Sequence, residues 1–289
     1  MTTTAQAFDK FVDQISPTPE QTTAVKGKRT TTENHLRGAF PSSNATPLQR
    51  VVLIGSAARG TLTRPIDDID VMAQFTNKDR IFEQYRADSG AFLQRIRRAL
   101  DAKTSIADIG ARGQAVRLFY KSGAHVDIAP TFKWSGEGFA LPDGSGGWTT
   151  TDPEAQAAWM VERRKQLGSH LTTVVKMAKR WNRVHSSRLS SFHVEVMTAT
   201  MFSSLNGNLR DAMRCWFDWA PKYLDVDDPA GHGGNLGGNL TSTSRVALRE
   251  RLGNAETRAS LAIAHEEAGS HTDAKRIWKY EFGDQFPAS

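Results

Sequence analysis

The apolar positions in the first half of the chain have the spacing of β-strands. Val51-Val52-Leu53-Ile54 is a mostly β-branched run that ends at Gly55, which predicts a buried strand followed by a turn. In the next run, Asp68-Ile69-Asp70-Val71-Met72, acidic and apolar residues alternate. Side chains alternate between the two faces of a strand, so Asp68 and Asp70 should share one face while the apolar residues point into the core.

Two further apolar runs predict a hairpin. Val116-Arg117-Leu118-Phe119-Tyr120 and His125-Val126-Asp127-Ile128-Ala129-Pro130 are separated by Lys121-Ser122-Gly123-Ala124. Asp127 should therefore lie on a central strand between apolar neighbours, where an unpaired charge is costly. A carboxylate in that setting needs a cation.

The remainder of the chain has mostly helical spacing. Apolar residues recur at helical intervals in an N-terminal segment, at Phe8, Phe11, Val12 and Ile15. The same spacing predicts a helix over about residues 169–184, with Leu171, Val174, Val175, Ala178 and Trp181 on one face. A C-terminal helical stripe contains Leu248, Leu252, Ala255, Ala259, Ala262 and Ile263. Further helices are predicted over about residues 20–40 and 79–100. Glycine and proline predict a surface loop between Trp134 and Trp148 and a flexible connector from Pro229 to Gly238. We therefore predict two domains, a strand-rich core with an N-terminal helix over residues 1–152 and a helical lobe over residues 153–289.

Composition narrows the possible functions. The net charge of +6 over 289 residues suits phosphate-rich substrates but is modest for a dedicated nucleic-acid binder, so nucleic-acid binding is not expected. The single cysteine, Cys215, lies beside Trp216 and Phe217 and should be a buried structural thiol. The histidines show no spacing typical of zinc. Without a long apolar run or a signal-peptide core, we expect a soluble cytoplasmic protein with no membrane association.

Three carboxylates, those of Asp68, Asp70 and Asp127, are the strongest chemical signal. Carboxylates on one face repel each other unless a cation lies between them, and three can hold two Mg²⁺ ions, or Mn²⁺, against a nucleoside triphosphate. At Gly55-Ser56, backbone N–H groups and a hydroxyl can bind phosphate oxygens. Each signal alone is weak, because an Asp-x-Asp pair is often a solvated strand edge. Their order along the chain favours nucleotidyl transfer.

Two later segments offer phosphate-binding groups. Lys179 lies at the edge of its helical stripe, where a lysine reaches either into a cleft or into water. Ser190 and Ser191 precede the apolar segment that begins at Phe192. A serine at this position usually caps the helix, and the free N–H groups of the same helix end can bind a phosphate. The two roles are compatible.

The motifs together resemble a known family. Gly55-Ser56-Ala57-Ala58-Arg59-Gly60-Thr61, Asp68-Ile69-Asp70 and Val126-Asp127-Ile128-Ala129-Pro130 resemble the polymerase-β-like nucleotidyltransferase superfamily. Nearly end to end, the chain looks most like the bacterial cGAS/DncV-like nucleotidyltransferases (CD-NTases, the SMODS family). This resemblance includes Trp148 to Asp152-Pro153, Lys179-Arg180-Trp181, Leu189-Ser190-Ser191-Phe192-His193, Asp228-Pro229, Trp278 to Phe282-Gly283 and Phe286-Pro287. It implies an α+β fold, with a twisted mixed β-sheet in the catalytic lobe and a helical C-terminal lobe.

The resemblance also implies a reaction. The chain would join ribonucleoside triphosphates into a cyclic di- or trinucleotide second messenger by a two-metal mechanism, releasing pyrophosphate, in bacterial antiphage (CBASS) signalling. Asp68 and Asp70 would bind both metal ions, and Asp127 would bind the ion that activates the acceptor hydroxyl.

Nucleotide contacts follow from the same resemblance. Lys179 and Ser191 match residues that contact the triphosphate, and Phe192 matches an aromatic residue that packs on a base. Gly55 and Ser56 would also bind the phosphates, and Ser190 is expected to bind the nucleotide together with Ser191.

Partners and alternatives complete the expectation. A separate effector would read the cyclic product, a regulatory protein would bind an exposed C-terminal segment, Gln285-Phe286-Pro287-Ala288-Ser289, and the protein would be a monomer.

One alternative is transfer to a linear oligonucleotide, an RNA end or a small molecule. Another is a catalytically silent nucleotide-binding scaffold, which the presence of all three aspartates disfavours.

Overall fold

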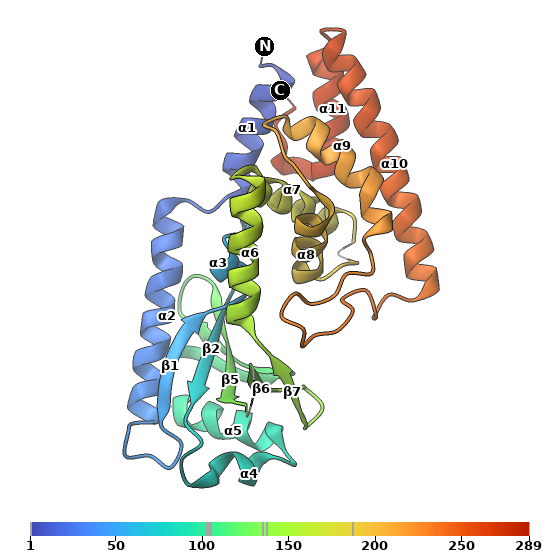
Figure 1. Cartoon of the computed structure of the whole chain (residues 1–289). Coiled ribbons are helices and arrows are strands. Elements are labelled where there is room, and N and C mark those ends of the chain that lie inside the picture. The colour runs from blue at the N-terminus through green and yellow to red at the C-terminus, as the bar shows by residue number, and fades with distance from the viewer. Residues whose placement is uncertain (1, 102–105, 135, 137, 187, 289) are drawn as a thin grey trace. The chain divides into compact units, whose positions relative to one another are not determined.

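The computed structural model describes residues 2–101, 106–134, 136, 138–186 and 188–288 (Figure 1). The chain divides into two compact units. Unit 1 consists of Met1–Pro17, Gly60–Pro65 and Ala158–Ser289, and unit 2 of Thr18–Arg59 and Ile66–Ala157. The predicted fold class is confirmed, since unit 2 holds a mixed β-sheet and unit 1 is helical.

This division differs from the predicted domains at three points. Residues Gly60–Pro65, inside the predicted first domain, belong to unit 1. The boundary falls between Ala157 and Ala158, inside helix α6 (Pro153–Leu167), rather than before that helix. The N-terminal helix α1 (Thr4–Ile15), which the sequence pattern groups with residues up to 152, belongs to unit 1. The cause is its apolar face, because Phe8 and Phe11 are fully buried in the core of the helical unit.

In the described residues, the sheet of unit 2 contains seven strands in the order β1-β2-β5-β4-β3, with β6 paired to β5 and β7 paired to β6. Their bounds are β1 Leu48–Leu53, β2 Asp68–Phe75, β3 Ile106–Arg112, β4 Ala115–Tyr120, β5 His125–Lys133, β6 Phe139–Pro142 and β7 Trp148–Thr151. Only β2 and β5 pair in parallel among these ladders. The predicted β4–β5 hairpin is confirmed.

A second hairpin replaces part of the predicted surface loop. Strand β6 pairs with the end of β5, and β7 pairs with β6, so a loop throughout Trp134 to Trp148 was wrong. The physical reason is burial, since Phe139 and Ala140 lie in the core and need backbone partners there. The glycine-rich turn lies between these two strands, and residues 135 and 137 are outside the described part of the chain.

Helices cover one face of the sheet. They are α2 (Pro19–Ala39), η1 (Lys78–Arg80), α4 (Ile81–Tyr85) and α5 (Ser89–Leu100), so the helix predicted near residues 79–100 is interrupted. The short helix α3 (Gly55–Arg59) follows β1 instead. Phe75 of β2 and Phe132 of β5 each contact Phe92 of α5, with ring centroids 5.2 and 5.0 Å apart. Alternation puts Asp68 of β2 and Asp127 of β5 on the opposite face from these rings.

Unit 1 is built from long helices around an aromatic core. They are α1, the last part of α6, α7 (His170–Val184), α8 (Ser191–Met201), α9 (Leu209–Trp219), α10 (Ser242–Glu267) and α11 (His271–Phe282), with 3-10 turns η2 (Ala220–Lys222) and η3 (Gly283–Gln285). Trp181, Trp216 and Trp278 are buried in this core. Helices α10 and α11 form a long antiparallel pair (Figure 1), and the predicted stripe of α10 is buried from Leu248 to Ala262. No helix in the described residues is long and apolar enough to span a membrane.

The C-terminal segment is packed rather than exposed. Phe286 is 1% exposed, and its ring centroid lies 5.2 Å from that of Phe8 and 5.3 Å from that of Phe11. Residues 285, 287 and 288 are half-buried, and Ser289 lies outside the described residues. The expectation of an exposed tail was therefore wrong, because the aromatic residue completes the core around α1.

Two smaller expectations are also modified. The connector from Pro229 to Gly238 is a hydrogen-bonded loop, in which the buried Asp228 carboxylate accepts from the backbone N–H groups of Ala230 and Gly233 at 3.1 and 2.8 Å. Cys215 is half-buried, and burial raises the pKa of its thiol. Both features are structural.

Candidate active site

Two cross-strand rows of polar residues lie on the face of the sheet opposite Phe75 and Phe132. In the parallel β2–β5 ladder, Asp68 is the partner of His125, and Asp70 is the partner of Asp127. Partners in a ladder point to the same face, so these four side chains share it. On the neighbouring strand β4, Arg117 is the partner of Asp127. The predicted alternation along Asp68-Ile69-Asp70 is confirmed by burial, since Ile69 is buried and the two aspartates are not.

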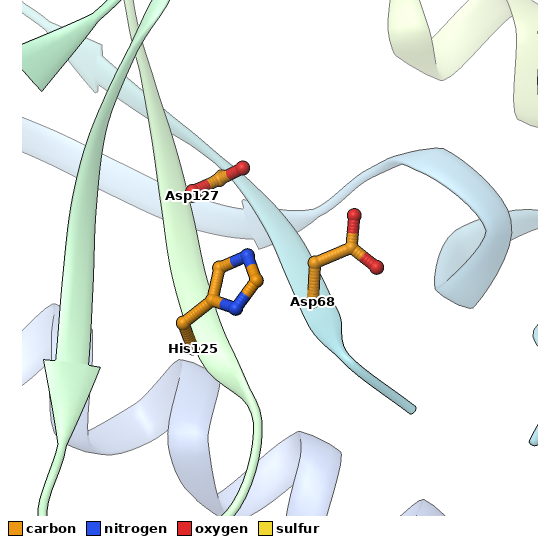
Figure 2. Close-up of side chains that lie close together, drawn as sticks. All are labelled: Asp68, His125 and Asp127. Carbon is orange, nitrogen blue, oxygen red and sulfur yellow. The ribbon is translucent and has the colours of Figure 1, made fainter. Parts of the chain in front are cut away.

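Asp68, His125 and Asp127 form a group of possible metal ligands. One ligand atom from each of the three residues lies within 4.8 Å of the others. Figure 2 shows the three side chains gathered at one place, where β2 and β5 run side by side. Asp68 is exposed, whereas the other two are half-buried.

Arg117 holds Asp127 in place. Its Nε donates to Oδ1 of Asp127 and its Nη2 to Oδ2, both at 2.7 Å, while the Asp127 side chain is only 16% exposed. The hydrogen bond to Asp127 is the main cause that raises the pKa of Arg117, and the charges of Asp68 and Asp70 act in the same direction. The buried charge expected at Asp127 is thus paired within the protein.

Asp70 lies against Gly55, the glycine at the end of the first predicted strand. Gly55 has a φ of +62°, and a Cβ built there would overlap Oδ2 of Asp70. Only glycine accepts both this backbone conformation and this proximity. The amide of Ile54 donates to the carbonyl of Asp70 at 3.0 Å, which fixes the two segments together.

The Gly55-Ser56 turn opens a short helix. Helix α3 begins at Gly55 and ends at Arg59, so Ser56 lies in its first turn, half-buried. The first backbone N–H groups of any helix have no acceptor within the helix itself. The sequence-predicted members of unit 2, Gly55, Ser56, Asp68, Asp70 and Asp127, are therefore neighbours around β2.

The predicted residues of unit 1 surround the start of α8. Lys179 of α7 is 9% exposed, so the alternative of a solvated lysine is excluded. Its Nζ donates to the Thr61 carbonyl and to Oε1 of the fully buried Glu195, both at 3.0 Å. Burial, and then the charge of Lys179, lower the pKa of the nearby Lys176.

Ser190 is the N-cap of α8. Its hydroxyl accepts from the His193 backbone N–H at 3.1 Å, as a helix cap should. Ser191 is exposed at the first helical position, and Phe192 is half-buried against the core of unit 1. The triphosphate and base contacts expected of these residues remain predictions.

The cluster on β2 and β5 fits a divalent cation. Carboxylates and imidazole are ordinary ligands for such ions. Nε2 of His125 is buried and has no hydrogen-bond partner in the described structure, which is uncommon for a buried polar atom. Asp68 and Asp127 would hold the ion, with Asp70 beside them in the ladder.

Sequence reasoning missed His125 and Arg117. Both depend on cross-strand register, which no local pattern reveals. The sequence nevertheless contained a pattern that points to His125. His125 precedes Asp127 by two residues, the same interval that separates Asp68 from Asp70. On a strand this interval puts both side chains on one face.

Comparison with curated proteins finds relatives along the whole chain. A probable cyclic nucleotide synthase of Bacillus cereus (strain VD146) is 26% identical over 328 aligned positions, which cover 99% of this chain and 98% of the relative. A cyclic AMP-AMP-AMP synthase of Escherichia coli (strain MS 115-1) is 27% identical over 207 positions, covering 65% of this chain and 61% of that protein.

Solved structures share the fold. Two structures of E. coli MS115-1 CdnC, one in complex with HORMA-deltaN and one with ATP, superpose with TM-scores of 0.80 and 0.79. Each is 19% identical and covers 98% of both chains. At this identity the likeness concerns the fold, and it confirms the α+β architecture.

The model of the Second Messenger Oligonucleotide or Dinucleotide Synthetase (SMODS) domain matches residues 1–164, more than half of the chain. This match includes every residue of the β2–β5 cluster. It confirms the resemblance carried by the Gly-Ser and Asp-x-Asp motifs. The chain therefore belongs to the SMODS family and is a nucleotidyltransferase.

Proposed function

We propose that the protein joins ribonucleoside triphosphates into a cyclic di- or trinucleotide and releases pyrophosphate. The observation that carries this proposal is the cross-strand group of Asp68, His125 and Asp127 in a member of the SMODS family. The printed activities of the B. cereus and E. coli relatives, a probable cyclic nucleotide synthase and a cyclic AMP-AMP-AMP synthase, support a cyclic product.

We call the face that carries Asp68, Asp70 and Asp127 the acidic face, and each of these residues has a part in this reaction. Divalent ions, Mg²⁺ or Mn²⁺, would neutralise the phosphates and lower the pKa of the attacking hydroxyl. Asp68 and Asp70 would bind both ions, and Asp127 the one nearest the acceptor hydroxyl. Arg117 fixes the Asp127 carboxylate through both oxygens and so sets the direction of its remaining lone pairs.

Phosphate binding would use backbone and side-chain donors. We assign this role to Gly55 and Ser56 at the start of α3, and to Lys179 and the exposed N-terminus of α8 at Ser190 and Ser191. Helix N-termini bind phosphate because their first N–H groups lack helical acceptors. Phe192 would pack on a base.

The proposed biological role is supported by another similar protein, a CBASS oligonucleotide cyclase CdnC of Escherichia coli (strain KTE188). The product would be read by a separate effector in antiphage (CBASS) signalling. A protein regulator is also proposed, since CdnC was solved in complex with HORMA-deltaN. Its binding site would not be an open C-terminal tail, because Phe286 is buried.

The test is product analysis. The purified protein is incubated with all four ribonucleoside triphosphates and Mg²⁺ or Mn²⁺, then treated with phosphatase, and the surviving material is identified by mass spectrometry. A phosphatase-resistant mass of two or three nucleoside monophosphates minus the same number of waters supports the proposal. Linear products would replace it with oligonucleotide polymerisation. Triphosphate binding without pyrophosphate release would favour the alternative of a catalytically silent nucleotide-binding scaffold.

A further inference from the structure

We infer that His125 is a nitrogen ligand of the cation held by Asp68 and Asp127, and that it gives this metal centre a preference for Mn²⁺ over Mg²⁺. This inference deepens the proposed function and rests on its metal centre. It concerns a residue that the Asp-x-Asp and third-Asp motifs do not include.

The position of His125 is set by the sheet. The parallel register makes it the direct partner of Asp68, and strand alternation puts it on the same face as Asp127. The three residues bring one ligand atom each within 4.8 Å of the others, which is the separation of donors around a single ion. Figure 2 shows the imidazole beside both carboxylates.

The histidine has an unused donor or acceptor atom. Nε2 of His125 is buried and makes no hydrogen bond in the described structure. The ring of Phe119 packs against His125, with ring centroids 5.4 Å apart, and it offers no hydrogen-bonding atom. An unsatisfied buried nitrogen costs free energy that a metal–ligand bond would recover.

An unpartnered nitrogen alone would not identify a ligand. His193 in unit 1 also has an Nε2 without a hydrogen-bond partner, but it is not among the groups of possible ligands in the described residues. Among the described residues, only His125 both has such a nitrogen and belongs to a group with two carboxylates. The combination, rather than the burial, carries the inference.

Charge favours a neutral ligand at this position. Asp68, Asp70 and Asp127 bring three negative charges to the face, and Arg117 compensates one of them. An imidazole adds a donor without adding charge. Nitrogen ligands suit first-row transition ions, whereas Mg²⁺ binds oxygen and retains water, so His125 strengthens Mn²⁺ binding more than Mg²⁺ binding.

Pulsed EPR tests the bond directly. Protein is prepared with unlabelled histidine and with ¹⁵N-histidine, and loaded with one equivalent of Mn²⁺ without nucleotide. We expect a nitrogen hyperfine coupling that changes with the isotope and disappears in His125→Ala. A spectrum without isotope-sensitive nitrogen coupling would overturn the inference. Because the labelled protein has its natural sequence, this result does not depend on whether the variant folds.

Competition between the two ions tests the preference. The dissociation constants of Mn²⁺ and Mg²⁺ are measured for the unsubstituted protein, for His125→Ala and for His232→Ala, a control in the loop of unit 1. The ratio of the Mg²⁺ to the Mn²⁺ constant should fall about 10-fold or more in His125→Ala, since even indirect partners of metal ligands contribute 10- to 100-fold. It should not change in His232→Ala. An unchanged ratio in His125→Ala would reject the preference.

The outcome separates this inference from the proposed function. A protein that shows the nitrogen coupling but makes no nucleotide product keeps His125 as a ligand and loses the proposed reaction. A protein that makes a cyclic product but shows no coupling keeps the reaction and loses the ligand.

Discussion

Arg117 and Asp127 are joined by two parallel hydrogen bonds of 2.7 Å each, across the antiparallel β4–β5 ladder. This fork fixes both oxygens of the third carboxylate before any substrate is present. It also places a permanent positive charge beside the position where a metal ion would bind. Arg117 therefore orients Asp127 and, at the same time, weakens the attraction of the acidic face for cations.

Replacement of Arg117 should separate these two effects. In Arg117→Gln, the loss of a nearby positive charge should tighten Mn²⁺ binding about tenfold, while turnover falls because Asp127 is no longer oriented. Arg117→Lys keeps the charge but not the fork, so its metal affinity should stay near that of the unsubstituted protein while its turnover is reduced. Isothermal titration and initial rates measure both. Weaker Mn²⁺ binding in Arg117→Gln would contradict this account.

The carboxylates themselves should be essential for turnover. Asp68→Asn or Asp127→Asn removes a negatively charged ligand with almost no change in shape, so product formation should fall by at least about 100-fold while the melting temperature is nearly unchanged. Asp101→Asn, at an exposed position of unit 2, is the matched control and should retain full activity. Normal rates in either active-site variant would remove the assignment.

Gly55 should tolerate no side chain. In Gly55→Ala, the new methyl group meets the Asp70 carboxylate at a positive φ, so the free energy of unfolding should fall by about 2 kcal/mol and activity should be lost. Gly27 provides the control, because it lies inside α2 and a Cβ there has no neighbour within 4 Å. Gly27→Ala should raise the free energy of unfolding by about 0.5–1 kcal/mol. Urea unfolding curves compare the two, and a Gly55→Ala protein of unchanged stability would disprove the steric argument.

The buried pair of Lys179 and Glu195 should contribute to stability as well as to function. Lys179→Met leaves a carboxylate of 0% exposure without its ammonium partner, so the free energy of unfolding should fall by about 3 kcal/mol. Part of this loss should return in Lys179→Met/Glu195→Gln, but activity should not return if Lys179 also binds phosphate. The exposed pair of Lys165 and Glu162 gives the control, where Lys165→Met should change the free energy by less than about 1 kcal/mol.

His193 should make the protein less stable in acid. Burial lowers the pKa of this side chain below its ordinary value near 6.5, although a hydrogen bond to the Leu224 backbone and the charge of Asp225 oppose the shift and Arg245 adds to it. Below about pH 6.5 the unfolded chain therefore binds a proton that the folded chain does not, and the free energy of unfolding decreases as the pH falls toward the folded pKa.

The corresponding variant tests this sign. His193→Asn removes one titrating group, so the slope of unfolding free energy against pH between 7 and 5 should decrease by up to about 1.4 kcal/mol per pH unit. Burial also lowers the pKa of His185, so some slope should remain. His232→Asn, in the hydrogen-bonded loop of unit 1, serves as the control. A His193→Asn protein with an unchanged slope would show that His193 does not titrate differently on folding.

Local patterns predicted the parts of the site that lie on one strand. Alternation was enough to put Asp68 and Asp70 on one face, and the apolar neighbours of Asp127 were enough to put it on a central strand. The resemblance to a family rested on the same short motifs. The fold class and the shared face of Asp68 and Asp70 were therefore predictable without coordinates.

The remainder depended on contacts between distant segments. Spacing along the strand puts His125 on the same face as Asp127, but its pairing with Asp68 comes from the cross-strand register, and Arg117 became a partner of Asp127 only across a hairpin. Helix spacing placed Lys179 at an edge but could not reveal the buried Glu195 that receives it. Likewise, glycines concealed the β6–β7 hairpin, since its backbone pairing is decided by the end of β5.

The aromatic packing of Phe8 and Phe11 against Phe282 and Phe286 has a consequence for how the protein is made. Helix α1 is synthesised before unit 2, and its aromatic partners are synthesised after it. Unit 2, a continuous stretch except for residues 60–65, can fold as it emerges, but the core of unit 1 is incomplete until Phe282 and Phe286 have been added. A chain whose synthesis stops before Phe282 would thus carry the three aspartates of unit 2 without a complete core in unit 1.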